Sequence, residues 1–289
     1  MIEATGPNAQ QIAYWNEQAG PRWVRLQALL DVQLAPLGEA VMDTLALAAG
    51  ERVLDVGCGC GDTTLAIARR VGATGSVTGL DISGVMVERA RQRARDAGLT
   101  NVRFEIADAQ THRFEPGGFD ALFSRCGVMF FADPVAAFTN LRAALRPGGR
   151  LGFVCWQAMQ HNPWLMEPLK VAAQHLVVPP PPAPDAPGPF AFADPDRVRD
   201  IVSGAGFAAV AIDDRSEQLT LGPSADIEQV ADFLMQMGPT ATALREADPE
   251  VQQRVASDMR AMLVPYQTAD GVVMSAKAWI VTARQVLEG

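Results

Sequence analysis

Apolar residues recur at helical spacing through the first fifty positions of the chain. The predicted apolar faces of two successive helices are formed by Trp23, Leu26, Leu29 and Leu30, and then by Leu37, Val41 and Leu45. We expect a break at Gly20-Pro21 and a stop at Gly50, because glycine tolerates the left-handed conformation that often ends a helix. The chain therefore opens with a predicted helical segment.

From residue 52, short apolar runs alternate with helical patterns. Strands are predicted over 52–56, 76–80, 101–106, 118–124 and 150–156. The helices between them are expected over 62–71, over 84–97, and from Asp133-Pro134 to Pro147-Gly148-Gly149. Strands joined by helices pair in parallel through right-handed crossovers. This pattern predicts the α/β class, with a doubly wound, mostly parallel sheet that becomes seven-stranded with the two strands predicted after Trp156.

The pattern loosens after Trp156. Helices are predicted over 161–178, 194–206, 225–237 and 249–264, and strands over 207–212 and 276–282. A proline-rich run over 179–184 is typical of a stiff spacer or the edge of a lid. We therefore expect a helical lid over 1–49, a cofactor-binding core over 50–156 and a cap and substrate region over 157–289. Residues 8–30 and 157–192 are expected to cover the ligand pocket.

Composition narrows the possible partners. The formal net charge of −9 opposes docking on nucleic acid. No apolar run is long enough for a membrane-spanning helix, and the first residues do not resemble a secretory signal, so we expect a cytoplasmic protein. The four cysteines and three histidines lack the spacing of a metal site, and we predict reduced, mostly buried thiols and no bound metal.

The most informative segment is the glycine-rich turn after the first predicted strand. Gly57, Gly59 and Gly61 alternate, whereas a dinucleotide fingerprint would place its third glycine at Asp62. A carboxylate, Asp55, also lies inside the preceding strand. Glycines here allow a tight turn and a close approach of backbone to a ligand.

Two further strand ends carry carboxylates. Asp81 ends the second strand, where it can accept hydrogen bonds from both ribose hydroxyls of an adenosine, and Ile82 can pack on the purine. Asp108 ends the third strand and can accept from an adenine amino group, while the amide of Ala109 donates to the ring. Together with the glycine turn, these residues predict a nucleoside site.

These segments resemble the class I S-adenosylmethionine-dependent methyltransferases, and most of all the small-molecule type of ubiquinone and menaquinone biosynthesis. The matching motifs are Leu54 to Gly61, Asp81, Ala107-Asp108-Ala109, Phe119-Asp120 and Leu145 to Gly149. The resemblance implies S-adenosyl-L-methionine as cofactor, with its methionine part at the glycine turn, its ribose at Asp81 and its adenine near Asp108. Further cofactor contacts are expected from Asp55, Cys58, Ser124 and Trp15. The helix around Tyr14-Trp15-Asn16 is similar to segments that close over the cofactor.

Methyl transfer from a sulfonium is an in-line displacement that needs alignment and exclusion of water more than acid–base chemistry. A base is required only for a protonated acceptor. His161 is the candidate base, Arg125 is a candidate for orienting an anionic group or forming an ordinary ion pair, and Tyr14 is a candidate hydrogen-bond donor. Apolar residues beyond the strand ends predict a small, hydrophobic or aromatic acceptor, although about half of them are expected to be plain core. They are Met129, Phe130, Phe131, Trp156, Trp164, Phe190 and Phe192.

Two other classes of protein share part of this pattern. A regulatory module that binds S-adenosylmethionine without catalysis shares the same cofactor motifs. A nicotinamide-dependent dehydrogenase does not fit the glycine spacing. The sequence therefore favours a methyltransferase.

Overall fold

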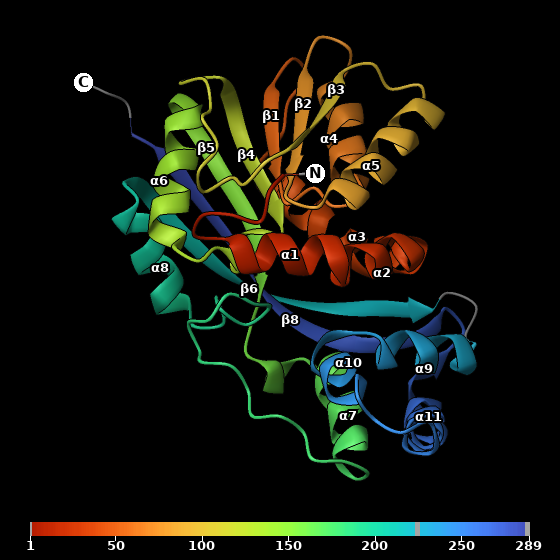
Figure 1. The fold of residues 1–289 in the computed structure, drawn as a ribbon. Coiled ribbons are helices and arrows are strands. Elements are labelled where there is room, and N and C mark those ends of the chain that lie inside the picture. Colours follow the sequence, from red (N-terminus) through yellow and green to blue (C-terminus); the bar gives the residue numbers. More distant parts are fainter. Residues whose placement is uncertain (1, 223–225, 287–289) are drawn as a thin grey trace.

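The protein is described by a computed structural model that covers residues 2–222 and 226–286. The strands are β1 (Arg52–Val56), β2 (Ser76–Asp81), β3 (Val102–Ile106), β4 (Phe119–Arg125), β5 (Leu145–Trp156), β6 (Phe207–Gly222), β7 (Gln267–Thr268) and β8 (Gly271–Gln285). The sheet order is β3-β2-β1-β4-β5-β8-β6, with β7 beside β8 (Figure 1). The first five strands pair in parallel, and β8 is antiparallel to β5 and β6. The predicted doubly wound, mostly parallel fold is confirmed, but the described residues form eight strands rather than the predicted seven, because the short β7 pairs with β8.

The helices are α1 (Ala9–Glu17), α2 (Ala19–Arg25), α3 (Gln27–Thr44), α4 (Asp62–Val71), α5 (Gly84–Asp96), α6 (Pro134–Ala144), α7 (Pro163–Ala173), α8 (Pro195–Gly204), α9 (Ile227–Met235), α10 (Gly238–Leu244) and α11 (Pro249–Leu263). In the described ranges, none is long and apolar enough to cross a membrane. Strand β1 lies between β2 and β4, where the strand order reverses. In an open parallel sheet this is the position at which ligands bind, beyond the carboxyl ends of the strands.

The N-terminal helices differ from the prediction in where they break. The break lies at Gln18, between α1 and α2, and Gly20-Pro21 falls inside α2. Pro21 is tolerated because it stands in the first turn, where its missing N–H has no partner to lose. A Cβ on Gly20 would collide with the carbonyl oxygen of Trp15 and approach Ser83 Oγ to 2.6 Å. Gly20 thus serves close packing rather than a break.

Several other helix and strand boundaries also differ from the prediction. Helix α6 ends at Ala144, and β5 begins at Leu145, so the Pro147-Gly148-Gly149 segment lies in the strand and does not end the helix. Strands β6 and β8 are both longer than predicted, and β7 and α10 were not predicted. The predicted helix over 225–237 starts at a residue outside the described ranges, and α9 spans Ile227–Met235.

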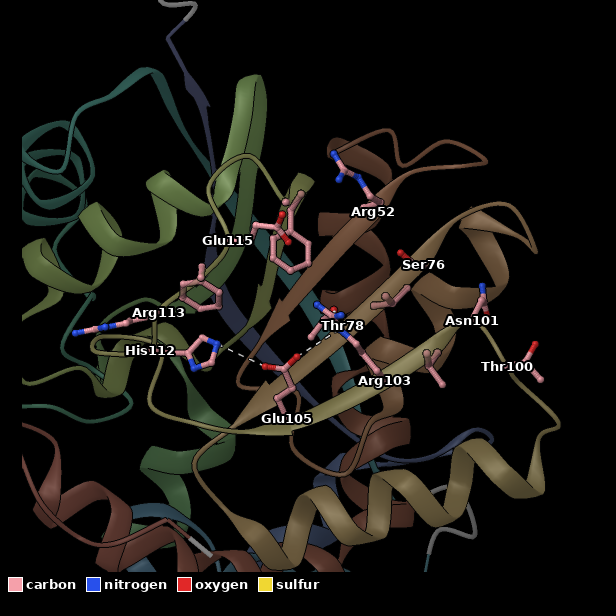
Figure 2. Close-up of a pocket in the computed structure, with 15 residues that line it drawn as sticks. Arg52, Ser76, Thr78, Thr100, Asn101, Arg103, Glu105, His112, Arg113 and Glu115 are labelled. Atoms are coloured by element: carbon pink, nitrogen blue, oxygen red, sulfur yellow. Dashed lines mark hydrogen bonds and ion pairs between the residues drawn. The ribbon is translucent and has the colours of Figure 1, made fainter.

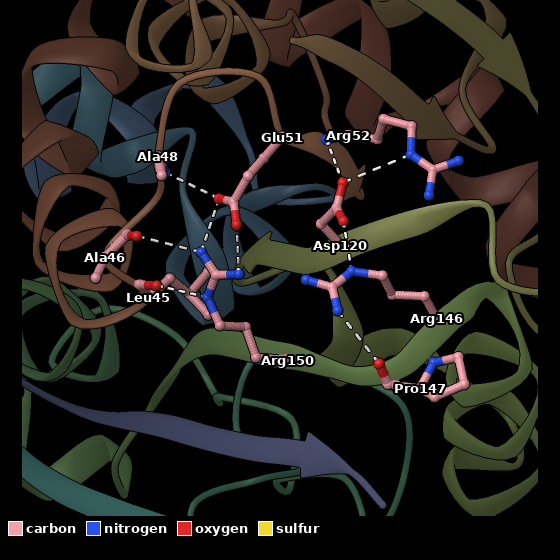
Figure 3. A network of polar contacts seen from close by, with 9 residues as sticks. All are labelled: Leu45, Ala46, Ala48, Glu51, Arg52, Asp120, Arg146, Pro147 and Arg150. Carbon is pink, nitrogen blue, oxygen red and sulfur yellow. Dashed lines mark hydrogen bonds and ion pairs between the residues drawn. The ribbon is translucent and has the colours of Figure 1, made fainter. Parts of the chain in front are cut away.

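The amino ends of the strands are held by a charged network (Figure 3). Arg150 pairs with Glu51 at 2.7 Å, and its Nε donates to the carbonyl of Leu45 at 2.6 Å. Asp120 pairs with Arg52 and Arg146. Burial disfavours the charged form of Glu51, but hydrogen bonds from Arg150 and Ala48 outweigh it and lower the pKa. This end of the sheet therefore supplies stability and is remote from the ligand-binding end.

The long β6–β8 pair extends past the rest of the sheet. Trp156 is the last residue of β5 and pairs with Ala278, whereas Lys277 to Val272 of β8 pair only with Ser216 to Gly222 of β6 and with β7. Helices α7, α9, α10 and α11 gather on this extension (Figure 1). They form what we call the cap.

Candidate cofactor and acceptor site

The glycine turn has the backbone conformation that the sequence predicts. Gly57, Gly59 and Gly61 have φ angles of 72°, 54° and 85°, a region that residues with a Cβ rarely adopt. A Cβ on Gly57 would also lie 2.7 Å from the Cα of Gly127, in the loop after β4. Cys58 is buried, and its amide donates to the carbonyl of Leu80 at 3.1 Å. Glycine is therefore required here both for the turn and for its contact with the neighbouring strand end.

Asp81 lies directly beside this turn. Its Oδ2 accepts from the amide of Gly59 at 2.8 Å, and its Oδ1 accepts from the amide of Ser83 at 2.8 Å. Burial raises the pKa of the carboxyl group, although these backbone hydrogen bonds oppose the shift. A carboxylate has about four acceptor positions. Both oxygens therefore retain capacity for ribose hydroxyls, which fits the predicted cofactor.

Asp108 is also buried, and it is bound to the N-terminal segment. The side-chain amide of Asn8 donates to both carboxylate oxygens, at 2.9 and 3.0 Å, and the amide of Gln110 donates to Oδ1 at 2.9 Å. Ala109 next to it is buried, and its carbonyl accepts from Asn140 at 2.9 Å. The carboxylate predicted to face adenine is thus shared with the lid.

Helix α1 covers the loop after β2. Asn16 donates to the carbonyl of Ile82 at 3.0 Å and accepts from the amide of Gly84 at 2.9 Å. The hydroxyl of Ser83 donates to the carbonyl of Trp15 at 2.9 Å. Figure 1 shows α1 crossing the sheet at its ligand-binding end. We call residues 8–25 the lid.

Aromatic residues form the inner side of the lid. Trp15 makes edge-to-face contacts with Tyr14, Trp23 and Phe130, with ring centroids 5.8, 5.6 and 5.3 Å apart. The hydroxyl of Tyr14 accepts from Arg22 at 3.4 Å. The lid is therefore packed onto the loop after β4 as well as hydrogen-bonded to those after β2 and β3.

Asp55 is fully buried below the turn. Its Oδ2 accepts from the hydroxyls of Thr63 and Thr64, at 2.7 and 2.6 Å, while Oδ1 has no partner among the described residues. Burial raises the pKa to about 6, despite those hydrogen bonds. Asp55 thus holds the start of α4 against the turn.

Arg125 and Ser124, at the end of β4, are both engaged in local contacts. Arg125 pairs with Asp62 at 2.8 Å, and Arg93 links Asp62 to Asp31. Ser124 Oγ donates to the carbonyl of Val56 at 2.7 Å and accepts from the amide of Gly127 at 3.2 Å. Ser124 therefore fastens β4 to β1, and Arg125 forms an ion pair at the edge of the glycine turn.

His161 lies apart from these groups. It is exposed in the short turn Met159–His161 after β5, and it lies close enough to Asp214 of β6 to help lower the pKa of that carboxyl. The larger contributions to this shift come from Lys277 and Gln157. In the described part of the chain, no hydrogen bond or ion pair joins His161 to the lid or the glycine turn.

The predicted apolar set beyond the strand ends is divided between buried and partly exposed residues. Met129, Trp156, Trp164 and Phe192 are buried, whereas Phe130, Phe131 and Phe190 are partly exposed. Trp156 and Trp164 lie 5.3 Å apart at the carboxyl end of β5. The expectation that part of this set is core is confirmed.

A groove of about 500 Å³ lies elsewhere, against β2 and β3 (Figure 2). His112 lies there beside Glu105 at 3.5 Å, and Arg103 pairs with the same carboxylate at 3.4 Å. Neither Asp81 nor the glycine turn lines this groove. It is therefore distinct from the candidate cofactor site.

Sequence reasoning missed Asn8 and the partners of Asn16. Asn8 is separated from Asp108 by one hundred positions, and nothing in the pattern around it marks a buried contact. Asn16 was noted only as part of the lid helix. The hydrogen bonds between Asn8 and Asp108 depend on how the N-terminal helices pack on the sheet, which the sequence pattern does not indicate.

Comparison with known proteins identifies the core. Residues 47–174 match the methyltransferase domain family. Over 118 residues the chain is 38% identical to aklanonic acid methyltransferase DauC of Streptomyces sp. (strain C5). This match covers 41% of this chain and 54% of that protein. It is 35% identical over 120 residues to a demethylmenaquinone methyltransferase of Staphylococcus aureus (strain MRSA252), covering 42% and 48%. The match thus spans about half the length of these relatives.

The fold agrees with a solved structure. A phosphoethanolamine N-methyltransferase of Haemonchus contortus, in complex with phosphomonomethylethanolamine and S-adenosylhomocysteine, aligns with a TM-score of 0.54 and 18% identity, covering 86% of this chain and 52% of that one. At this identity the likeness concerns the fold alone. The sequence matches show that residues 47–174 form a methyltransferase domain, and its glycine turn carries the motifs typical of class I S-adenosylmethionine-dependent methyltransferases.

Proposed function

We propose that this protein transfers a methyl group from S-adenosylmethionine to a small acceptor with an apolar or aromatic frame. The observation that carries the proposal is the bond between Asp81 and the amide of Gly59, under the lid. It joins a carboxylate suited to a ribose to a turn whose positive φ angles favour glycine. The tight glycine turn, the carboxylate of Asp81 and the lid over them are the features that this cofactor requires.

The chemistry needs little from acid or base groups. When bound, S-adenosylmethionine supplies a methyl group on a sulfonium, and the departing thioether is neutral. The chain's own residues orient the reactants and exclude water. Asn8 and Asn16 hold the lid on two strand-end loops, and Trp15 seals it against Phe130. Lids of this kind complete a site as they close.

The acceptor class is supported by the residues beyond β4 and β5. Trp156 and Trp164 pack against each other there as buried aromatic rings, and the partly exposed Phe130 lies beside the lid. Both relatives named above are named for small-molecule acceptors. The net charge of −9 disfavours a nucleic acid substrate.

The test is turnover. The protein is incubated with methyl-labelled S-adenosylmethionine and a panel of ring-containing phenols and ketones, and S-adenosylhomocysteine is quantified. We expect its formation to depend on an acceptor and to be lost in Asp81→Asn. Cofactor binding without turnover on any acceptor would favour the regulatory module instead.

The cellular compartment is part of the same proposal. We infer a cytoplasmic enzyme because Cys58, Cys60, Cys126 and Cys155 are free thiols. Three of them are buried, which raises their pKa values and makes them unreactive. Fractionation of cells that produce the protein would test the location.

A further inference from the structure

A glutamine on α3 is buried without any hydrogen-bond partner. Gln33 has no exposed surface, and neither its Nε2 nor its Oε1 has a partner among the described residues. It shares its helix face with the buried residues Leu30 and Leu37. An amide in apolar surroundings is costly unless something bonds to it. Such a group is therefore a candidate for contact with a ligand.

The course of α3 places Gln33 beyond the carboxyl end of β4. The helix runs antiparallel to β4 and β5: a Cβ on Gly152, in the middle of β5, would touch Leu45, and one on Gly38 would touch Arg125, the last residue of β4. Gln33 lies five residues before Gly38. At 1.5 Å per residue it is about 7.5 Å further along, past the strand end.

A second partnerless donor lies beyond the neighbouring strand. Trp164 is buried, its ring lies 5.3 Å from that of Trp156 at the end of β5, and its Nε1 has no partner among the described residues. Indole N–H is a donor only, whereas the glutamine amide both donates and accepts. Since β4 and β5 are adjacent, the two groups belong to adjacent strand ends.

Other contacts connect the regions around α3 and α7, the helices that carry Gln33 and Trp164. Arg25, just before α3, donates to Gln236 at 2.6 Å, at the end of α9. Two residues later, a Cβ on Gly238 would lie 2.8 Å from Leu165, the neighbour of Trp164. The beginning of α3 and the beginning of α7 thus border one region between the sheet and the cap.

We propose that Gln33 and Trp164 recognise the methyl acceptor, and that this acceptor is an uncharged ring system carrying a carbonyl or hydroxyl oxygen. The oxygen accepts from Trp164 Nε1 and from the Gln33 amide, and the ring packs on apolar surface that includes Trp156. Arg125, at the end of β4, is paired with Asp62, and Arg93, which reaches the start of α3, is paired with Asp31. The region therefore suits an oxygen-bearing neutral frame better than an ionic one. This inference rests on the proposed function.

Stability separates a ligand-binding role from a structural one. Gln33→Leu removes a buried amide that has no partner, so we expect the melting temperature of the free protein to rise, by about 3 °C. Gln157→Leu is the matched control, because Gln157 is also buried, at 4% exposed, but donates to Asp214 at 2.6 Å and to the carbonyl of Ala278 at 3.2 Å. This control should lower the melting temperature.

Binding is measured by calorimetry with 1-tetralone and with tetralin, which lacks only the carbonyl, in the presence of S-adenosylhomocysteine. We expect the wild-type protein to bind tetralone more tightly than tetralin. The variants Gln33→Leu and Trp164→Phe should each bind tetralone about tenfold more weakly and bind tetralin with unchanged affinity. A lower melting temperature for Gln33→Leu, equal affinities of the two probes, or no binding of either would overturn the inference. Failure of wild type to bind S-adenosylhomocysteine would instead overturn the proposed function.

Discussion

Asn8 donates its side-chain amide to both carboxylate oxygens of Asp108, at 2.9 and 3.0 Å. Its Nδ2 also reaches Gln110 at 3.0 Å, and its Oδ1 accepts from the amide of Ala132 at 2.8 Å. One lid residue therefore joins the loops after β3 and β4. Closure of the lid and the position of the carboxylate predicted to face adenine are thereby coupled.

Asn8→Ala is expected to loosen the lid. The substitution removes the Asn8 amide from the buried carboxylate of Asp108, and we expect a loss of about 1–3 kcal/mol in unfolding free energy. Release of S-adenosylhomocysteine, followed by stopped-flow tryptophan fluorescence, should be faster. Asn8→Asp should be worse, because it places a second carboxylate against Asp108. Unchanged release in both variants would show that Asn8 does not hold the lid.

Asp55 predicts a pH dependence of stability. Its pKa rises from 3.8 to about 6 in the folded protein. Between pH 4 and pH 6 the carboxyl group of Asp55 stays protonated in the folded protein but is ionised in the unfolded chain. Its contribution to the stability of the folded protein is therefore complete below about pH 4 and is lost as the pH rises through about 6. The size of the effect is about 3 kcal/mol.

Asp55→Asn isolates this contribution from those of Asp31 and Asp81, whose pKa values burial also raises. Urea unfolding of both proteins from pH 4 to 7.5 should show the variant gaining on wild type as pH rises. A difference that stays constant across this range would refute the assignment.

His161 is expected to be dispensable for the proton balance of the reaction. It is exposed beside Asp214, on the outer part of the sheet, and it is bonded to neither the lid nor the glycine turn in the described ranges. We expect His161→Ala to lower turnover by less than about threefold, far from the ~10²–10⁴-fold effect of losing a general base. A larger loss, with the cofactor affinity retained, would restore His161 as the base.

The core of the site was predictable because its determinants are local. The buried run over 52–56, the alternating glycines and the carboxylates at 81 and 108 each follow directly from a strand end, and parallel strands bring their ends together. The contacts of the lid were less predictable. The bonds of Asn8 depend on how the lid lies on the sheet, which no periodicity encodes.

The edge strands show a related limit. Asp213 to Gln218 of β6 are mostly polar and exposed, so the alternation that marks a half-buried strand is missing. They are extended because they pair with β8, and the pairing partner lies about sixty residues away in the chain. Likewise Gly20-Pro21 looked like a helix break because its role in packing on Trp15 and Ser83 is tertiary.

Asp81→Asn is expected to weaken cofactor binding by about 1–3 kcal/mol, because an amide cannot accept from both Gly59 and Ser83 and also from a ligand. Asp120→Asn is the control. Asp120 lies at the opposite end of the sheet, and its pairs with Arg52 and Arg146 serve stability. The control should unfold more easily and bind the cofactor as wild type does. Equal losses of affinity in both variants would mean that the effect is one of folding.

The most direct test of the cofactor assignment is a calorimetric titration of the wild-type protein. S-adenosylmethionine and S-adenosylhomocysteine should each bind at one site per chain, and a nicotinamide dinucleotide should not bind, because the turn has its third glycine at 61 and Asp62 next to it. Binding of the dinucleotide, or no binding of S-adenosylmethionine, would contradict the account.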